Sequence, residues 1–130
     1  VAGSLFWQLL LGSLVMLIFG FMGEAGIMAA MPAFVIGMAA WLYMIYVLYM
    51  GAGKSVVSTT SASVQTAYNS LLLIIVVGWS IYPLGYVFGY LMGAVDASTL
   101  NLIYNLADFV NKILFGLVIW KAAVDDKQTA

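Results

Sequence analysis

Residues 105–116 read NLADFVNKILFG, and they place a carboxylate and an amine inside an apolar segment. Asp108 and Lys112 are four residues apart, a spacing that brings two side chains onto one face of a helix and into contact range. Tyr104 lies one turn before this pair and Phe115 about one turn after it. An ionisable residue in a membrane-spanning helix costs roughly 2.5–3.5 kcal/mol on insertion scales, so the pair predicts a functional site.

The whole chain has the composition of an integral membrane protein. Of its 130 residues, 65% are hydrophobic and only 7% are charged, whereas soluble domains carry about 25% charged residues. The absence of His and Cys excludes disulfide scaffolds and the usual zinc and haem sites. A net charge of −1 gives no electrostatic support for binding nucleic acid. The expected surrounding of the chain is a lipid bilayer.

Four apolar segments follow one another at about residues 5–22, 25–49, 64–91 and 100–123. As a helix, each is long enough to cross about 30 Å of hydrocarbon. The first segment lacks the basic start and the cleavage site of a signal peptide, so we expect it to span the membrane. The pattern predicts an all-α membrane protein with four antiparallel transmembrane helices in one domain, residues 1–124, followed by a polar tail at 125–130.

The third segment carries a proline in its interior and small residues after it. Pro83 frees a backbone carbonyl and predicts a kink. Gly85, Gly89 and Gly93 repeat every four residues, which predicts close approach of another helix. The fourth segment is expected to start at a polar N-cap, either Ser98 or Thr99.

Charged residues at or beyond the ends of the apolar segments predict the orientation in the membrane. Three lysines, Lys54, Lys121 and Lys127, fall on one side of a four-span topology. Two carboxylates, Glu24 and Asp96, fall on the other side. By the positive-inside rule, both termini are expected in the cytoplasm.

Three interpretations of the Asp108–Lys112 pair remain open on the residues alone. The two side chains can form a structural ion pair, gate an ion or proton pathway, or take part in covalent chemistry. In the covalent case a desolvated amine condenses with a carbonyl compound as a Schiff base, and the protonated imine needs a carboxylate counterion. Asp108 is placed to contribute to that counterion, and Tyr104 is a candidate hydrogen-bond donor to Asp108.

Aromatic and sulfur-containing side chains of the other segments are candidates for the wall of a ligand site. Trp79, Tyr82 and Tyr86 lie at i, i+3 and i+7, so they stack along one helix face around Pro83. Alone, such a stripe indicates ordinary packing, but a long apolar ligand held on a lysine needs rigid aromatic walls. Two further sets, which by themselves indicate core packing, are Met31, Phe34, Val35 and Met38 on the second segment, and Met16 and Gly20 on the first.

Three stretches together are similar to a known family. LNLIYNLADFVNKILFGLVIW at 100–120, GWSIYPLGY at 78–86 and GSLVMLIFGFMGEAGIMAAMPAF at 12–34 closely resemble the last four helices of proteorhodopsin-like microbial (type 1) rhodopsins. The resemblance covers nearly the whole chain, and the lysine helix is its most specific part. It implies that the four spans match helices four to seven of a seven-helix bundle.

The same resemblance implies a cofactor and a function. Lys112 would carry retinal, all-trans in the dark, as a protonated Schiff base, with Asp108 as a carboxylate of the counterion. The chain would be part of a light-driven outward proton pump in a bacterial inner membrane and not an enzyme. The expected retinal pocket comprises Trp79, Tyr82, Pro83, Tyr86, Met16, Gly20, Met31, Phe34, Met38 and Asn111.

The sequence also departs from the family pattern. Helices one to three, which would supply the proton acceptor, the proton donor and their Arg and His partners, have no counterpart, and the chain holds no Arg and no His. Met31 stands where the family usually has a Trp that packs on the retinal ring. We therefore expect a second chain or a missing segment to complete the bundle, or a homo-oligomer. The alternative functions are a truncated or redesigned four-helix module that oligomerises without pumping, and a light sensor.

Overall fold

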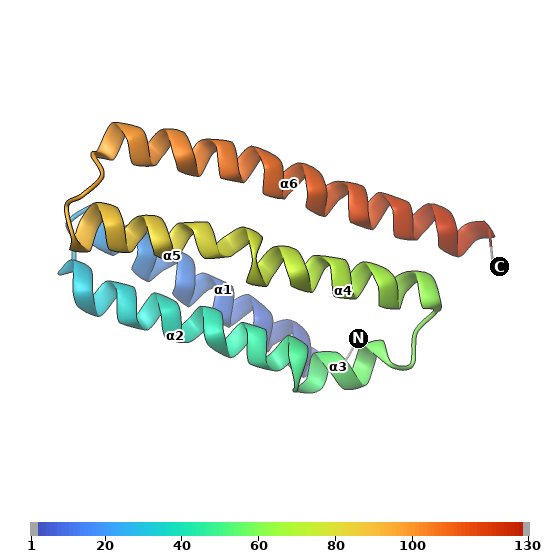
Figure 1. Ribbon diagram of the computed structural model, residues 1–130. Coiled ribbons are helices and arrows are strands. Elements are labelled where there is room, and N and C mark those ends of the chain that lie inside the picture. The colour runs from blue at the N-terminus through green and yellow to red at the C-terminus, as the bar shows by residue number, and fades with distance from the viewer. Residues whose placement is uncertain (1–2, 129–130) are drawn as a thin grey trace.

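The structure is a computed structural model that describes residues 3–128, and every regular element in that range is a helix (Figure 1). Four helical stretches are long and apolar enough to cross a membrane, at Gly3–Glu24, Ala30–Val57, Ala62–Leu91 and Ala97–Lys127. The helices are α1 (Gly3–Glu24), α2 (Ala30–Tyr49), α3 (Ala52–Val57), α4 (Ala62–Val76), the 3₁₀ turn η1 (Gly78–Ser80), α5 (Ile81–Tyr86), the π-helical turn η2 (Val87–Leu91) and α6 (Ala97–Gln128). The predicted all-α membrane fold with four antiparallel spans is confirmed.

The four spans lie side by side in sequence order. α1 packs against α2, α2 packs against α4 and α5, and both α4 and α5 pack against α6 (Figure 1). Few side chains are buried in this arrangement; Ala33, Met44 and Leu100 are examples. Large apolar side chains such as Phe21 and Phe109 are exposed, which is the surface that a lipid environment requires.

A glycine turn joins the first two spans. α1 ends at Glu24, and Gly26 follows with a φ of +70°, a left-handed conformation that glycine adopts at no steric cost. The Ile27 N–H donates to the Met22 carbonyl at 2.9 Å, as in a Schellman helix end. This turn uses residues 25–29, so α2 begins at Ala30 rather than at the expected residue 25.

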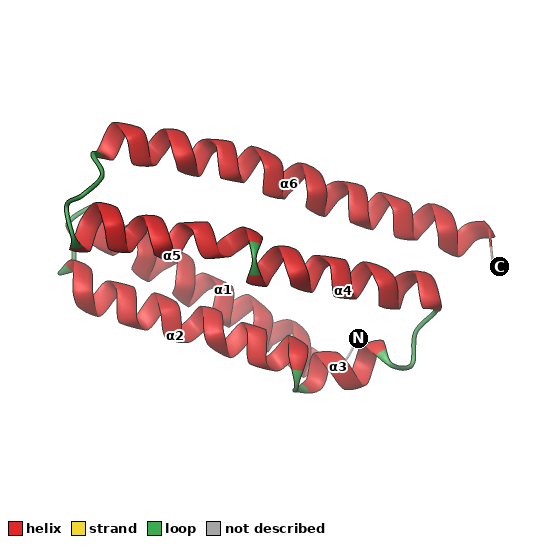
Figure 2. Cartoon of the chain, viewed as in Figure 1, coloured by secondary structure: helices red, strands yellow, loops and turns green. Residues whose placement is uncertain are grey.

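The third span departs from a regular α-helix on both sides of Pro83, with a 3₁₀ turn before it and a π-turn after it. α4 ends at Val76, and the break between α4 and η1 is visible in Figure 2. Pro83 has no N–H to donate, and its ring opposes the carbonyl four residues earlier, so a regular α-helix cannot continue through this region. The chain passes instead through the 3₁₀ turn η1, the single-turn helix α5 and the π-turn η2.

Side chains from neighbouring helices pair with backbone carbonyls along the interrupted span. These donor–acceptor pairs are Trp41 Nε1 to Ile75 O at 3.2 Å, Asn111 Nδ2 to Gly78 O at 3.1 Å, and Tyr104 Oη to Tyr82 O at 2.9 Å. An unpaired carbonyl in hydrocarbon costs several kcal/mol, because no water is available to bond it. The three bonds therefore stabilise the broken helix and tie it to α2 and α6.

Two glycines allow α6 to approach the third span closely. A Cβ added at Gly85 would lie 2.6 Å from Tyr104 Cε1, and one added at Gly89 would lie 2.6 Å from Leu100 Cδ2. The expected small-residue contact is thus present at these two positions. Gly93 differs from the expectation, because it has a φ of +63° and turns the chain after η2 instead of extending the ridge.

The last helix begins with an aspartate cap. Asp96 Oδ1 accepts the Thr99 N–H at 2.9 Å, and Asp96 Oδ2 accepts the Thr99 hydroxyl at 2.6 Å. The expectation of Ser98 or Thr99 as the N-cap is wrong, since α6 starts at Ala97 and both residues lie in its first turn. Asp96 is the residue whose side chain can reach back to the free N–H groups.

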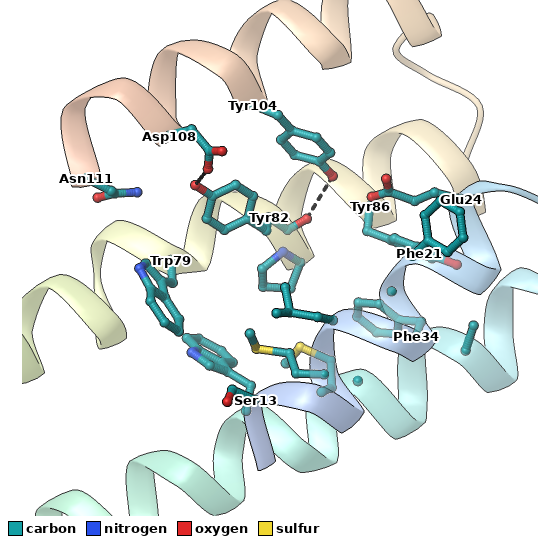
Figure 3. Close-up of a pocket in the computed structure, with 18 of the residues that line it drawn as sticks. Ser13, Phe21, Glu24, Phe34, Trp79, Tyr82, Tyr86, Tyr104, Asp108 and Asn111 are labelled. Carbon is teal, nitrogen blue, oxygen red and sulfur yellow. Dashed lines mark hydrogen bonds between the residues drawn. The ribbon is translucent and has the colours of Figure 1, made fainter. Parts of the chain in front are cut away.

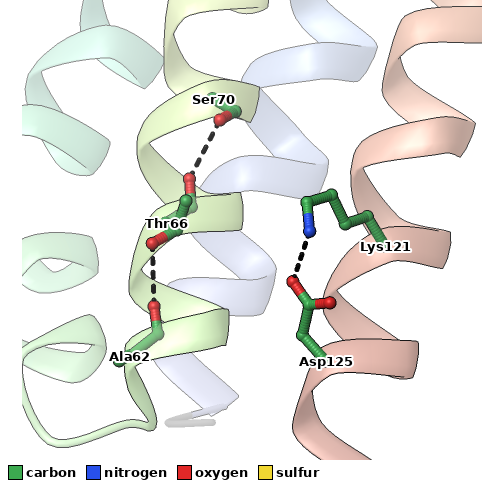
Figure 4. Close-up of polar contacts among 5 residues, drawn as sticks. All are labelled: Ala62, Thr66, Ser70, Lys121 and Asp125. Atoms are coloured by element: carbon green, nitrogen blue, oxygen red, sulfur yellow. Dashed lines mark hydrogen bonds and ion pairs between the residues drawn. The ribbon is translucent and has the colours of Figure 1, made fainter.

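α6 extends further at its C-terminal end than expected. The helix continues through Gln128, so residues 125–128 of the predicted polar tail are helical, while residues 129–130 lie outside the described range. Lys121 Nζ pairs with Asp125 Oδ2 at 2.7 Å, beside the back-bonded hydroxyls of Thr66 and Ser70 on α4 (Figure 4). An ion pair at i, i+4 supports a helix beyond the apolar segment.

The close contact between α1 and α5 predicts a large effect of one methyl group. A Cβ at Gly23 would lie 2.0 Å from the Tyr86 hydroxyl and 2.7 Å from Ala33 Cβ, whereas a Cβ at Gly20 meets nothing within 4 Å. We expect Gly23→Ala to lower the free energy of unfolding by about 1–3 kcal/mol. Gly20→Ala is the matched control and should be neutral or slightly stabilising. SDS titration followed by circular dichroism measures both, and equal stability of the two variants would contradict this packing.

The Asp96 cap predicts a pH dependence outside the membrane spans. Its hydrogen bonds from the Thr99 hydroxyl and N–H hold the pKa of the Asp96 carboxyl below its ordinary value of 3.8. A pKa that is lower in the folded chain adds stability above pH 3.8, and this stability is lost as the pH falls through the folded pKa. When the pH falls below the folded pKa of Asp96, we expect the Thr99 amide to exchange fast with solvent. Asp96→Asn keeps a capping oxygen that does not titrate, so its Thr99 amide should remain protected.

Candidate ligand-binding site

A cavity of about 810 Å³ lies between α1, α2, α5 and α6 (Figure 3). Its apolar walls are Met16, Leu17, Gly20, Phe21, Ala33, Phe34, Gly37, Met38, Trp41, Trp79, Pro83 and Phe115. Its polar lining residues are Ser13, Glu24, Tyr82, Tyr86, Tyr104, Asp108, Asn111 and Lys112. A site of this size, with mostly apolar walls and a few polar groups, suits a small organic ligand.

An ion pair on α6 supplies the charged groups of the cavity. Lys112 Nζ lies 2.8 Å from Asp108 Oδ2, so the predicted contact across one helical turn is present. From α5, the Tyr82 hydroxyl donates to Asp108 Oδ1 (Figure 3). Asp108 therefore accepts hydrogen bonds on both oxygens, one from a cation and one from a hydroxyl, which stabilises its charged form.

Tyr104 has a different partner from the expected one. Its hydroxyl donates to the backbone carbonyl of Tyr82 at 2.9 Å, and not to Asp108. The reason is the direction of the side chain: the Tyr104 ring extends from α6 toward α5 and lies 5.5 Å from the Tyr82 ring. Tyr82 thus takes the place at Asp108 that the sequence suggested for Tyr104.

The Lys112 side of the cavity is open. The Lys112 side chain is 76% exposed and the Asp108 side chain 44% exposed. Elsewhere in the cavity wall, Phe34 stacks on Tyr86 with ring centroids 5.5 Å apart. Tyr86 is buried, and its hydroxyl donates to the Ala30 carbonyl at 3.1 Å. The site is therefore a slot with aromatic walls and a charged open edge.

All of the predicted pocket residues except Met31 line this cavity. They come from α1, α2, η1, α5 and α6, and the structure brings together Trp79, Tyr82, Pro83, Tyr86, Met16, Gly20, Phe34, Met38 and Asn111, with Lys112 and Asp108.

Met31 is 57% exposed and lies outside the cavity. The residues of α2 that face the cavity include Phe34, Gly37 and Trp41. Met38, which is seven residues after Met31 and on nearly the same helix face, does line the cavity. Met31 lies outside because it is in the first turn of α2, ahead of Ala33, where the cavity lining on this helix begins. Val35, which is 56% exposed, falls outside the cavity as well.

Some wall residues were missed by the sequence interpretation. Trp41 follows Phe34 by seven residues, so a helical period extended along the second segment would have included it. Phe21 directly follows Gly20, so the period of Met16 and Gly20 does not include it. Glu24, expected as a loop carboxylate, lies at the end of α1 and faces the cavity (Figure 3). Glu24 follows Gly20 by four residues and Met16 by eight, so the helical period extended to the end of the first segment would have included it.

The chemistry available in the site follows from its two charged groups. A primary amine in an apolar slot can bind a carbonyl compound covalently, and the adjacent carboxylate compensates a positive charge on the nitrogen. Among the described residues, no group of three His, Cys, Asp or Glu side chains is placed to hold a metal ion. The arrangement therefore favours an organic ligand with a long apolar body.

Comparisons with known proteins agree with the resemblance. Residues 2–126 match the family described as bacteriorhodopsin-like protein. The chain is 66% identical, over its full length, to 53% of the green-light absorbing proteorhodopsin of Gamma-proteobacterium EBAC31A08. It is 67% identical, also over its full length, to 53% of the blue-light absorbing proteorhodopsin of Gamma-proteobacterium Hot 75m4. The chain thus spans about half the length of these curated relatives.

A solved structure supports the same relationship. The chain superimposes on the crystal structure of blue light-absorbing proteorhodopsin from Med12 with a TM-score of 0.80 and 46% identity. The match covers 96% of this chain and 57% of that structure.

The Tyr104 hydrogen bond predicts a measurable contribution to stability. Tyr104→Phe leaves the Tyr82 carbonyl without its side-chain donor, so we expect a loss of about 0.5–1.5 kcal/mol in the free energy of unfolding. Tyr46→Phe is the control, because Tyr46 is 58% exposed on α2 and does not line the cavity. The two variants are compared by SDS titration. A Tyr104→Phe chain as stable as the Tyr46→Phe chain would argue against the bond.

Proposed function

The chain belongs to the bacteriorhodopsin-like family, and from this membership we propose that it is the retinal-binding part of a light-driven outward proton pump. Retinal is attached to Lys112 as a Schiff base, and Asp108 belongs to its counterion. The observation that carries the proposal is the Lys112–Asp108 pair, at 2.8 Å, on the wall of an aromatic slot.

The cavity fits the chemistry of retinal, a long apolar polyene that ends in an aldehyde. Lys112 is the amine among the cavity residues, so the aldehyde end is directed to this edge of the slot. Phe34, Trp79 and Tyr86 supply flat walls for the polyene at the other positions. When bound, retinal supplies the absorption of light and a change of shape on isomerisation.

The residues of this chain hold a proton at one defined atom. Lys112 Nζ lies next to Asp108 Oδ2, and the carboxylate favours a protonated nitrogen there. The Tyr82 hydroxyl donates to the other oxygen of Asp108 and stabilises the negative charge. Displacement of the nitrogen relative to Asp108 would weaken this stabilisation, so motion of a bound retinal would favour transfer of the proton from the nitrogen to an acceptor group.

The open edge of the slot requires a cover in the membrane. Lys112 and Asp108 are too exposed to face hydrocarbon without cost. We infer that a second chain, a further segment or another copy of this chain packs there and supplies the groups that accept and donate protons. The proposed cover corresponds to the part of the relatives that lies outside the matched half.

The orientation proposed for the chain places both ends in the cytoplasm of a bacterial cell. Lys54 in α3 and Lys121 and Lys127 near the C-terminal end of α6 belong to one end of the helix bundle, while Glu24 at the end of α1 and Asp96 before α6 belong to the opposite end (Figure 1). An excess of lysine marks the cytoplasmic side of membrane proteins.

A spectroscopic experiment tests the proposed attachment of retinal. All-trans retinal is added to the purified chain, and to the chain co-expressed with the N-terminal half of the green-light absorbing relative. We expect a band shifted to the red of free retinal, bleached by hydroxylamine and absent in Lys112→Ala. Lys121→Ala is the matched control and should keep the band, because Lys121 lies outside the cavity.

The possible outcomes separate the competing functions. A band together with light-driven acidification outside cells supports a pump, whereas a band without any pH change favours a light sensor. Free-retinal absorbance in every sample, with or without the co-expressed half, would contradict retinal binding. The chain would then be a four-helix module in which Asp108 and Lys112 form a structural ion pair.

A further inference from the structure

Asn111 is a buried polar side chain in the middle of α6, with only 9% of its surface exposed. Its amide nitrogen donates to the Gly78 carbonyl in η1 at 3.1 Å. Figure 3 shows Asn111 beside Asp108 on the cavity side of α6, facing the interrupted span. A primary amide inside a membrane is costly unless it is hydrogen-bonded, so this contact has to offset that cost.

Gly78 is shaped to receive the amide. A Cβ at position 78 would lie only 2.3 Å from Asn111 Oδ1 and 3.2 Å from Asn111 Cγ. Any other residue at position 78 would therefore push the amide away. The short 3₁₀ turn η1 presents the carbonyl toward α6, where a continuous α-helix would direct it along its own axis. Glycine and asparagine are thus a matched pair across two helices.

The bond connects the two parts of the chain that carry the reactive amine and the aromatic wall. Asn111 immediately precedes Lys112, and Gly78 immediately precedes Trp79. Two other hydrogen bonds join α6 to α5, one from the Tyr104 hydroxyl to the Tyr82 carbonyl and one from the Tyr82 hydroxyl to Asp108. On α6, both lie on the N-terminal side of Lys112. α6 is also held by α4, against which it packs, and by the Ser61 hydroxyl, which donates to Asp126 near the end of the helix. The Asn111 bond is therefore the hydrogen bond to the third span that acts directly beside Lys112, and its loss lets the lysine shift locally relative to Trp79.

We propose that Asn111 is a positioning residue, which holds Lys112 at a fixed place relative to Trp79 through the Gly78 carbonyl. The hydrogen bond is a property of this chain alone, while its effect on the attached retinal rests on the proposed function. The two parts are tested by separate measurements.

The first measurement needs no retinal. Gly78–Trp79 is the only Gly-Trp pair in the sequence, so ¹³C-carbonyl glycine combined with ¹⁵N tryptophan labels a single peptide bond. In Asn111→Ala we expect an upfield shift of the Gly78 carbonyl resonance, because a hydrogen bond to it is lost. Asn105→Ala is the matched control, since Asn105 is an exposed asparagine on the same helix, and it should leave the resonance unchanged.

The second measurement uses the retinal-loaded chain, with the co-expressed half where the band requires it. In Asn111→Ala we expect a displaced absorption band and hydroxylamine bleaching about fivefold faster, the change given by a hydrogen bond of typical net strength. Gly78→Ala should have the same effect, because it expels the amide. The double variant should be no worse than either single variant, since both remove one interaction.

The outcomes test the hydrogen bond and the positioning role separately. An unchanged Gly78 carbonyl resonance in Asn111→Ala overturns the proposed hydrogen bond. A shifted carbonyl with an unchanged band and bleaching rate overturns the positioning role, as do additive effects of the two substitutions. A shifted carbonyl with no band in the unsubstituted chain contradicts retinal binding and leaves the bond as a structural contact. Asn111→Ser replaces Asn111→Ala if the alanine variant does not fold.

Discussion

The structure depends on the requirement that backbone carbonyls remain hydrogen-bonded inside a membrane. Pro83 makes a regular third span impossible, and the chain responds with a 3₁₀ turn, a short helix and a π-turn. Trp41, Asn111 and Tyr104 donate to carbonyls of this interrupted span. Because the donors come from α2 and α6, pairing these groups also fixes the relative positions of three of the four spans.

The same donors form part of the ligand-binding site. Trp41, Asn111 and Tyr104 all line the cavity, so the groups that stabilise the broken helix are also groups that a ligand would contact. The cavity lies between α1, α2, α5 and α6, and its charged edge is open.

Much of the site could be predicted from periodicity and chemistry. Asp108 and Lys112 meet as their spacing requires, and Trp79, Tyr82 and Tyr86 all reach the cavity. The errors concern contacts that spacing along one helix does not fix. Met31 was placed in the pocket although the cavity lining on α2 begins after it, at Ala33. Tyr104 was assigned to Asp108 although its ring reaches across to α5.

The sequence alone determined the membrane character, the four spans and the identity of the charged pair, because these depend on hydropathy and on contacts within one helix. Only the tertiary structure decided which residue completes each bond. The hydrogen bonds from Tyr82 to Asp108 and from Asn111 to the Gly78 carbonyl follow from how separate segments pack. The choice of Asp96 as the helix cap follows from where α6 begins. Such contacts join residues distant in the chain or depend on a single helix boundary, and neither leaves a periodic trace in the sequence.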